Sequence, residues 1–283
     1  MNANESLPDP AVLRAASDAG DAEAAQALAV LAGTGFRMPQ DWGLALGQLE
    51  RAAGLGSASA QAQMALLSAE GGGPDLSAWL APARILPLSE QPRILTLPGF
   101  VTRQACDWII GRASERMAAA EVFDPSTGLG RRHAVRSNSA CVFQLMDMDL
   151  IMVLLRERIL RATGLPPYGL EPLQVLKYEP GQSFDWHVDY LTPDQPGLAR
   201  DMAEKGQRIA TALVYLNDDY EGGETAFEST GLRHRGARGD GVLWANTLPD
   251  GRPDTLTRHA GLPPTKGVKW VVSQWCRGGP PRR

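Results

Sequence analysis

The sequence predicts an α+β protein in which a jelly-roll double sheet with flanking helices follows a small all-α helical-repeat segment. Two changes along the chain predict this arrangement. Residues 1–72 are rich in alanine, leucine and glycine and almost free of β-branched residues, which favours helix. After about residue 93, short strand-like runs alternate with glycine, proline and acidic turns, which indicates a sandwich or barrel.

The composition argues against two classes of binding partner, nucleic acids and membranes. A net charge of -4 over 283 residues gives no basic excess for nucleic-acid phosphates to bind, so we expect no nucleic acid. No apolar run approaches the roughly 20 residues of a membrane helix, and the opening MNANESLPDP lacks the parts of a secretory signal. We therefore expect a cytoplasmic protein with no membrane partner. Its separated cysteines are expected to be free thiols: Cys106, Cys141 and Cys276.

Residues 1–73 are predicted to form a helical-repeat segment. Small and apolar residues recur at an offset of 36, as in the pairs Gly20/Gly56, Ala24/Ala60, Ala29/Ala65 and Leu31/Leu67. Between the matching stretches, Asp41 is placed to cap a helix that carries Leu44 and Leu49. The spacing resembles SEL-like repeats, relatives of the tetratricopeptide class. A generic alanine-rich helical hairpin is the alternative.

The remaining elements follow in order. Residues 74–92, which contain four prolines, are interpreted as a linker, and 93–283 as the second domain. Residues 94–97 are expected to form a strand, and residues 102–119 a helix with Thr102 as its N-cap. A second helix is expected over 149–162. The later strand-like runs are LQVLKYE, FDWHVDYL, IATALVYLN, ETAFES, GDGVLWAN and VKWVVSQWC.

The run FDWHVDYL holds a histidine and an acid two residues apart, His187 and Asp189. Residues two apart on a strand point to the same face, so both side chains can bind one ion. A second histidine would complete a set of two histidines and one carboxylate, which suits non-haem Fe(II) with open positions for oxygen chemistry. His259 precedes a strand and is the better candidate, because His234 in RHRGARG is typical of a solvated loop residue.

From about Arg93 to Arg277 the chain resembles the prolyl 4-hydroxylase-like branch of the Fe(II)- and 2-oxoglutarate-dependent dioxygenases. Five pieces occur in the family's order: LQVLKYEPGQSFDWHVDYL, GQRIATALVYLND, EGGETAF, GDGVLWAN and HAGLPPTKGVKWVVSQWCR. The resemblance implies a double-stranded β-helix fold with His187, Asp189 and His259 as Fe(II) ligands. It also implies 2-oxoglutarate as cosubstrate, O₂ as oxidant and ascorbate as a further reductant.

The resemblance also implies roles for residues around the metal. Lys269, ten residues after His259, would meet the far carboxylate of 2-oxoglutarate. Tyr178 and Thr225 would hydrogen-bond the same molecule, and Trp275 would line its pocket. Each of these four has an ordinary alternative as a core, turn or surface residue.

The substrate side is defined by three positions. Arg208 and Arg136 would contact the substrate. Phe184 stands where the family frequently has tyrosine, so substrate placement is expected to differ from the best-known members. Residues 192–206 are interpreted as a mobile lid, with a passive loop as the alternative.

The function expected from the resemblance is hydroxylation of a prolyl residue in a protein or peptide, with succinate and CO₂ as coproducts. A free amino acid or another small molecule on the same fold is the nearest alternative. A non-catalytic adaptor built on a retired dioxygenase, and a cupin-like metalloenzyme that does not use 2-oxoglutarate, are two further alternatives. Substrate identity lies in variable loops and does not follow from the fold.

Overall fold

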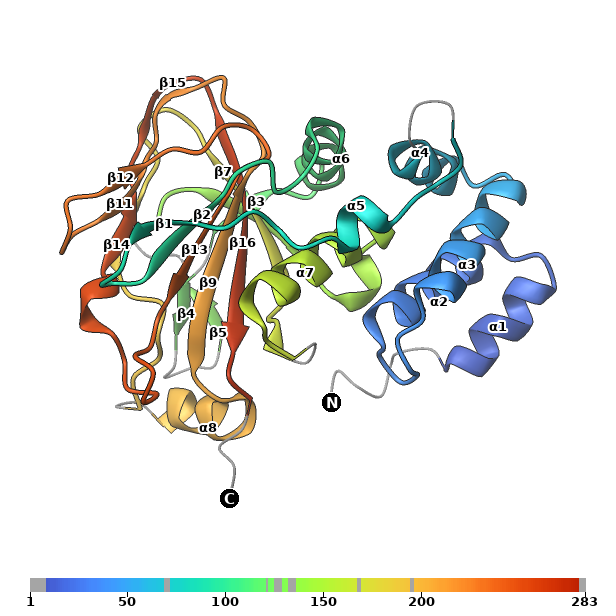
Figure 1. Ribbon diagram of the computed structural model, residues 1–283, viewed down its shortest axis with the longest axis horizontal. Helices are drawn as coiled ribbons and strands as arrows, with labels where there is room; N and C mark the ends of the chain where they lie inside the picture. Colours follow the sequence, from blue (N-terminus) through green and yellow to red (C-terminus); the bar gives the residue numbers. More distant parts are fainter. Residues whose placement is uncertain are drawn as a thin grey trace. The chain divides into compact units, whose positions relative to one another are not determined.

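The computed structural model describes residues 9–68, 72–120, 122–124, 129–131, 136–166, 169–193 and 196–279 (Figure 1). The chain divides into two compact units. One contains Met1–Pro82 and Phe143–Arg161, and the other contains Ala83–Val142 and Ala162–Arg283. This division differs from the predicted boundaries of 1–73, 74–92 and 93–283, because the stretch Phe143–Arg161 groups with the N-terminal helices.

The first unit is helical. Its elements are α1 (Pro10–Asp18), α2 (Ala22–Thr34), α3 (Trp42–Gly54), α4 (Ala58–Leu67), α5 (Ser77–Leu80), η1 (Leu145–Asp147) and α7 (Leu150–Thr163). Asp41 caps α3 as predicted, since its carboxylate accepts from the Leu44 backbone N–H at 2.9 Å. Leu28 and Leu31 of α2 are fully buried and form a core with Leu13 of α1. The predicted helix over 149–162 is confirmed as α7.

The offset of 36 is visible in the local structure of the helices. Asp21 and Ser57 are the N-caps of α2 and α4. Gly20 and Gly56, just before them, both have a left-handed backbone, with φ of 97° and 93°. The two corresponding helices therefore begin in the same way. Membership of the SEL-like class stays a prediction.

The second unit contains the sheets, and its architecture confirms the predicted α+β jelly roll. The large sheet has the order β1-β2-β13-β9-β16-β7-β6-β3, and a four-stranded sheet has the order β12-β11-β14-β8. The large sheet comprises β1 (Leu86–Ser89), β2 (Ile94–Leu97), β13 (Gly241–Ala245), β9 (Arg208–Tyr215), β16 (Lys269–Arg277), β7 (Leu173–Tyr178), β6 (Ser139–Phe143) and β3 (Ala118–Ala119). The smaller sheet comprises β12 (Arg233–His234), β11 (Thr225–Phe227), β14 (His259–Gly261) and β8 (Phe184–His187). Two short pairs complete the strands: β4 (Val122–Asp124) with β5 (Leu129–Arg131), and β10 (Glu221–Gly222) with β15 (Pro264–Lys266).

The interior of this unit is apolar and supports the site. Tyr215, Phe227 and Trp244 are almost completely buried in one cluster with residues of β2, β7 and β16. Helix α6 (Arg103–Ser114) and helix α8 (Pro196–Lys205) flank the sheets, and η3 (Thr255–Thr257) precedes β14. Figure 1 shows α8 at the end of the large sheet where β9 begins and β16 ends. In the part of the chain that the structure describes, each helix is too short or too polar to span a lipid bilayer.

Three expectations differ from the structure. The helix capped by Thr102 ends at Ser114 rather than near 119, and 118–119 form strand β3 instead. The stretch interpreted as a linker contains α5 and also β1, which pairs with β2 as the edge of the large sheet. Its Pro87 is compatible with an edge strand, where a missing N–H leaves no inner ladder bond unmade. His234 is no solvated loop residue, because it lies on β12 with its ring 5.8 Å from that of Tyr215.

Candidate active site

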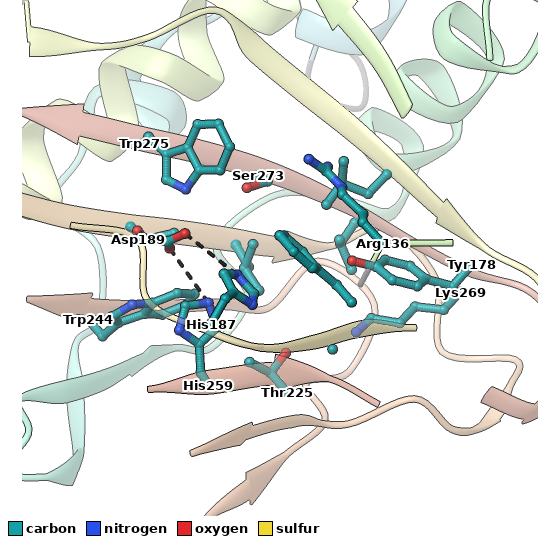
Figure 2. Close-up of a pocket in the computed structure, with 16 residues that line it drawn as sticks. Arg136, Tyr178, His187, Asp189, Thr225, Trp244, His259, Lys269, Ser273 and Trp275 are labelled. Carbon is teal, nitrogen blue, oxygen red and sulfur yellow. Dashed lines mark hydrogen bonds and ion pairs between the residues drawn. The ribbon is translucent and has the colours of Figure 1, made fainter. Parts of the chain in front are cut away.

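The pairing of β8 with β14 assembles the predicted metal ligands. His187 on β8 is directly opposite His259 on β14, and their ring centroids are 4.2 Å apart. Asp189 lies just beyond the end of β8 rather than on it, and its carboxylate oxygens are 3.7 Å and 3.6 Å from Nε2 of His187 and His259. One ligand atom from each residue lies within 4.8 Å of the other two. Figure 2 shows the three side chains converging from these separate segments.

The backbone fixes which nitrogen of each histidine faces the site. Nδ1 of His187 is 2.6 Å from the Asp185 carbonyl, and Nδ1 of His259 is 3.0 Å from the Thr257 carbonyl. A carbonyl only accepts, so each Nδ1 carries a proton and each Nε2 is the nitrogen placed to bind a metal. The same local contact, to the carbonyl two residues earlier, prepares both ligands.

The carboxylate ligand is oriented by a chain of polar groups that the sequence did not reveal. Thr211 Oγ1 donates to Asp189 Oδ2 at 2.7 Å, and Asn246 Nδ2 donates to Thr211 Oγ1 at 2.9 Å. All three side chains are buried, with Asn246 fully inaccessible. This arrangement fixes the carboxylate with Oδ1 nearest His187 and Oδ2 nearest His259. Thr211 and Asn246 lie in the GQRIATALVYLND and GDGVLWAN runs, where only their pairing across β9 and β13 brings them together.

The protonation states suit metal binding. Burial, reinforced by the neighbouring His259, lowers the pKa of His187 to about 3, so its imidazole is neutral at physiological pH. Burial by itself would raise the pKa of Asp189. The two imidazoles and the Thr211 hydrogen bond hold that pKa below its usual value, so Asp189 is ionised. Two imidazole nitrogens and one carboxylate fit Fe(II) and leave three coordination positions for other ligands.

A buried lysine lies in the same cavity as the three predicted metal ligands, on its other side. Lys269 begins β16, is 1% exposed and pairs in register with Tyr178 on β7. Its Nζ is 5.1 Å and 5.7 Å from the ring centroids of Tyr178 and Tyr215. Burial lowers the pKa of Lys269 to about 7, because a buried ammonium loses its hydration. Burial raises the pKa of Tyr178 to about 12, so its phenol is neutral and can donate.

Thr225 is held beside this cation by a second buried phenol. Its Oγ1 is 3.0 Å from the hydroxyl of Tyr215, which also donates to the His234 carbonyl at 3.2 Å. Gly222 and Gly223, just before β11, have φ of 69° and 68°, a left-handed turn that glycine adopts without strain. A Cβ at Gly223 would lie 3.0 Å from the Tyr220 ring, so this turn depends on glycine.

Arg136 and Phe184 form a stack on the iron-ligand side of the cavity. The Phe184 ring lies parallel to the His187 imidazole, with centroids 3.6 Å apart and planes 15° apart. The Arg136 guanidinium lies 4.7 Å from the Phe184 ring centroid and also donates to Asn138 Oδ1 at 3.1 Å. Both residues therefore line the cavity, as expected of substrate-side positions. Their contact with substrate stays a prediction.

The structure separates Arg208 from the cavity. Trp275 lines it, but Arg208 is not among its described lining residues. Instead the Arg208 guanidinium lies 3.7 Å from the Trp275 ring centroid and forms two bonds to Glu171, at 2.7 Å and 2.9 Å. The predicted substrate contact of Arg208 is therefore not visible in this conformation. Glu171 was missed by the sequence analysis, because it precedes β7 in a stretch without any recognisable motif.

One continuous cavity thus joins the three metal ligands to the buried lysine. The residues that line it are Arg136, Leu176, Tyr178, Phe184, His187, Asp189, Thr211, Leu213, Thr225, Trp244, His259, Gly261, Lys269, Val271, Ser273 and Trp275. A dicarboxylate that chelates a metal at one end and meets an ammonium at the other fits these groups. The complete set of ligands leaves the alternative of a retired enzyme without support.

Comparisons with known proteins agree with this site. The 2OG-Fe(II) oxygenase superfamily matches residues 173–277, which contain the three metal ligands and Lys269. "Probable prolyl 4-hydroxylase 4" of Arabidopsis thaliana is 30% identical over 220 residues, which cover 70% of this chain and 72% of the relative. "Prolyl 4-hydroxylase 2" of the same plant is 31% identical with the same coverage. A viral collagen prolyl hydroxylase from Paramecium Bursaria Chlorella virus-1, solved as a 2OG complex, superposes with a TM-score of 0.50 at 25% identity, over 65% of this chain and 94% of the viral one.

The fold and the site define a 2-oxoglutarate-dependent Fe(II) dioxygenase. At the level of sequence, the chain belongs to the prolyl 4-hydroxylase family. Its iron would be held by His187, Asp189 and His259, and its cosubstrate by Lys269 with Tyr178 and Thr225 beside it.

Proposed function

We propose that the protein hydroxylates a prolyl residue in a protein or peptide and converts 2-oxoglutarate and O₂ to succinate and CO₂. The observation that carries this proposal is the single cavity in which the His187–Asp189–His259 triad and the buried Lys269 lie together. The curated relatives described above are named prolyl 4-hydroxylases, which supports a prolyl substrate.

Each residue has a definite task in this reaction. Bound Fe(II) supplies the activation of O₂ that oxidises 2-oxoglutarate and hydroxylates the substrate C–H bond. Lys269 neutralises the far carboxylate, and the neutral phenol of Tyr178 donates to it. Thr211 and Asn246 hold Asp189 in one orientation. The apolar walls, including Leu176, Leu213 and Val271, keep water away from the reacting atoms.

A free amino acid or another small molecule remains the second candidate substrate. The observation that favours it is Phe184, which replaces a family tyrosine with an apolar ring stacked on His187. Without a phenol at this position, the substrate side has one polar group fewer with which to orient a peptide.

The N-terminal helices are proposed to serve the catalytic part of the chain. We propose that α1 to α4 are SEL-like repeats that bind a protein partner or substrate, since helical repeats generally provide binding surfaces. Their small number favours a short contact over a long groove. We also propose that the protein acts in the cytoplasm, where buried free thiols such as its three cysteines persist, and that ascorbate keeps its iron reduced.

The proposed function is tested with purified protein, Fe(II), ascorbate, 2-oxoglutarate and a library of proline-containing peptides. We expect succinate to form and a peptide to gain the mass of one oxygen atom on proline. Asp189→Ala should abolish both, while Asp185→Ala, which removes an exposed acid on β8 four residues earlier, should retain them. Succinate without any modified peptide, accompanied by a hydroxylated free amino acid, would favour the second candidate. If Lys269→Ala left 2-oxoglutarate affinity unchanged, a cupin-like enzyme without this cosubstrate would be the better description.

A further inference from the structure

Helix α8 belongs to an excursion of the chain that is closed at its base. The excursion lies between β8, which ends at His187, and β9, which begins at Arg208, and its base is the contact between Leu191 and Gln207. The Gln207 side-chain amide accepts from the Leu191 N–H at 2.7 Å and donates to the Leu191 carbonyl at 2.8 Å. Arg277, the last residue of β16, donates to the Gly206 carbonyl at 2.7 Å. The two ends of the excursion are therefore bonded to each other, and the later end is also bonded to β16.

A second contact joins the middle of α8 to the same arginine. Asp201 of α8 pairs with Nη2 of Arg277 and also with Lys205, one turn later, at 2.7 Å. The Arg277 side chain is only 6% exposed, whereas Lys205 is mostly exposed. The Asp201–Arg277 pair is thus the inner, better-shielded contact of the helix. It should persist in solution more than the exposed pair does.

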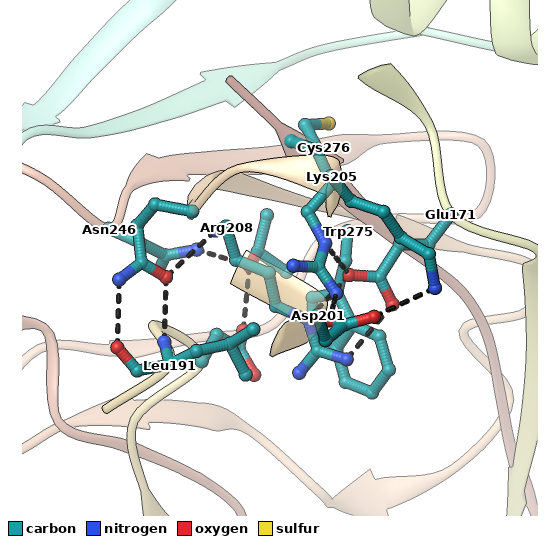
Figure 3. A network of polar contacts seen from close by, with 12 residues as sticks. Glu171, Leu191, Asp201, Lys205, Arg208, Asn246, Trp275 and Cys276 are labelled. Carbon is teal, nitrogen blue, oxygen red and sulfur yellow. Dashed lines mark hydrogen bonds and ion pairs between the residues drawn. The ribbon is translucent and has the colours of Figure 1, made fainter. Parts of the chain in front are cut away.

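Arg277 connects α8 to the wall of the cavity through a chain of side-chain contacts. Its Nε is 2.5 Å from Glu171 Oε1, the same oxygen that accepts from Arg208 Nε at 2.7 Å. Arg208 in turn lies over the ring of Trp275, which lines the cavity. Figure 3 shows Asp201, Glu171, Arg208 and Trp275 in one group of contacts. The carboxylates of Asp201 and Glu171 face the guanidiniums of Arg277 and Arg208, and the mostly exposed Lys205 adds a further cation beside Asp201.

We propose that Asp201, Arg277 and Glu171 are positioning residues that make α8 part of the cosubstrate pocket. With Asp201 charged, Arg277 divides its attraction between two carboxylates, and Glu171 also holds Arg208 against Trp275. Without that charge, Arg277 draws only on Glu171 and competes with Arg208 for the shared oxygen. The Trp275 wall then loosens, and 2-oxoglutarate binds more weakly.

The loss of the Asp201 charge should leave the positions of the metal ligands unchanged. Asp189 lies two residues before Leu191, whose backbone is fixed by Gln207 on both its N–H and its carbonyl. The Asp189 carboxylate is held separately, by the hydroxyl of Thr211. The coupling therefore predicts a change in cosubstrate affinity with no change in metal affinity. A general loss of folding would alter both.

The test measures binding, not turnover, on the full-length protein. Mn(II) affinity and 2-oxoglutarate affinity at saturating Mn(II) are determined by calorimetry for Asp201→Asn. Glu204→Gln is the matched control, because Glu204 lies on the same helix and pairs with the exposed Arg200. Lys205→Gln controls for the loss of the other partner of Asp201. Asp201→Glu retains the charge, and Arg277→Lys keeps one cation without the geometry to bridge two carboxylates.

We expect Asp201→Asn and Arg277→Lys to raise the Kd for 2-oxoglutarate by about three- to tenfold, with the Mn(II) Kd within about twofold of wild type. Both controls should match wild type, and Asp201→Glu should restore most of the affinity. Folded Asp201→Asn protein with wild-type cosubstrate affinity would overturn the proposal, as would an equal loss in Glu204→Gln. The inference rests on the proposed function only in that the cavity holds 2-oxoglutarate. Wild-type protein that binds 2-oxoglutarate but hydroxylates nothing would refute the proposed function and leave this coupling standing.

Discussion

Lys269 and Tyr178 face each other across the β16–β7 pair, with the ammonium nitrogen 5.1 Å from the centre of the phenol ring. The cation therefore rests against aromatic faces, and no carboxylate among the described residues pairs with it. Aromatic faces stabilise an ammonium only in part, by about 0.5–2 kcal/mol. The site thus contains a buried ammonium that an anionic ligand can pair with. The burial of Lys269 leads to two predictions.

The ligand-free protein should become more stable when Lys269 is removed. The folded-state pKa of about 7 is below the value of 10.5 in the unfolded chain, so the unfolded chain binds more protons between these limits. The cost of burying the charge is complete below pH 7 and is relieved as pH rises toward 10.5. Lys269→Met should therefore raise the free energy of unfolding near pH 7 by on the order of 3 kcal/mol. Urea unfolding at pH 7 and pH 10 measures this gain, which should shrink at the higher pH. A destabilised variant at pH 7 would contradict the cost assigned to Lys269.

The affinity for 2-oxoglutarate should fall as pH rises above 7. The ligand's far carboxylate binds the protonated form of Lys269, and in the free enzyme that form is lost through a pKa of about 7. Binding raises this pKa, so a proton is taken up, and the Kd should increase by up to about tenfold per pH unit between pH 7 and 9. Calorimetry with Mn(II), in buffers of different ionisation enthalpy, measures both the Kd and the proton uptake. Lys269→Arg, whose charge does not titrate in this range, should show a flat profile. A wild-type profile equally flat would show that Lys269 stays charged.

Thr211 should contribute to metal affinity although it is not a ligand. Thr211→Val removes the hydrogen bond to Asp189 and deprives Asn246 of its acceptor while keeping the volume of the side chain. We expect the Mn(II) Kd to rise by about tenfold, the usual effect of removing a group that orients a ligand. Thr211→Ser, which keeps the hydroxyl, should retain most of the affinity. Equal Mn(II) binding by the valine variant and wild type would show that Asp189 is oriented by the backbone alone.

The sequence predicts the ligands better than the groups that support them, for a physical reason. His187 and Asp189 are two residues apart, and His259 is marked by the strand and lysine that follow it, so local spacing is enough to find them. Thr211 and Asn246 are ordinary polar residues within strands. Asn246 supports Thr211, and through it Asp189, only because β9 pairs with β13 in one particular register. Nothing local specifies that register.

The segment interpreted as a lid contains a local signal for a helix. Its prolines and glycine suggested irregular chain, yet Pro196 stands at the first helical position, where a missing N–H costs nothing. Arg200 and Glu204, and Asp201 and Lys205, are each four residues apart, a spacing that stabilises a helix. These pairs make α8 predictable. The link between α8 and Glu171 is not predictable in this way, because it passes through Arg277, which is more than a hundred residues from Glu171.

Gln207 should protect the metal site from movements of α8. Its side-chain amide bonds to both backbone groups of Leu191, two residues after Asp189. Its backbone carbonyl accepts from the Gly278 N–H. Gln207→Ala should loosen the backbone that carries Asp189 and raise the Mn(II) Kd by about three- to tenfold. Gln207→Glu keeps the acceptor for the Leu191 N–H but loses the donor to its carbonyl, so an intermediate Kd is expected. Hydrogen exchange at the Leu191 amide should quicken in the alanine variant and stay slow in the glutamate variant.

The comparison with Asp201→Asn makes this prediction specific. Both variants alter the same excursion of the chain, one at its base and the other at the middle of its helix. The change at the base should weaken metal binding, because the released backbone leads directly to a ligand. The change in the helix should weaken cosubstrate binding alone, because its contacts lead through Glu171 to Trp275. If Gln207→Ala left Mn(II) affinity unchanged while 2-oxoglutarate affinity fell, the base of the excursion would belong to the same coupling as α8, and Thr211 would be the sole anchor of Asp189.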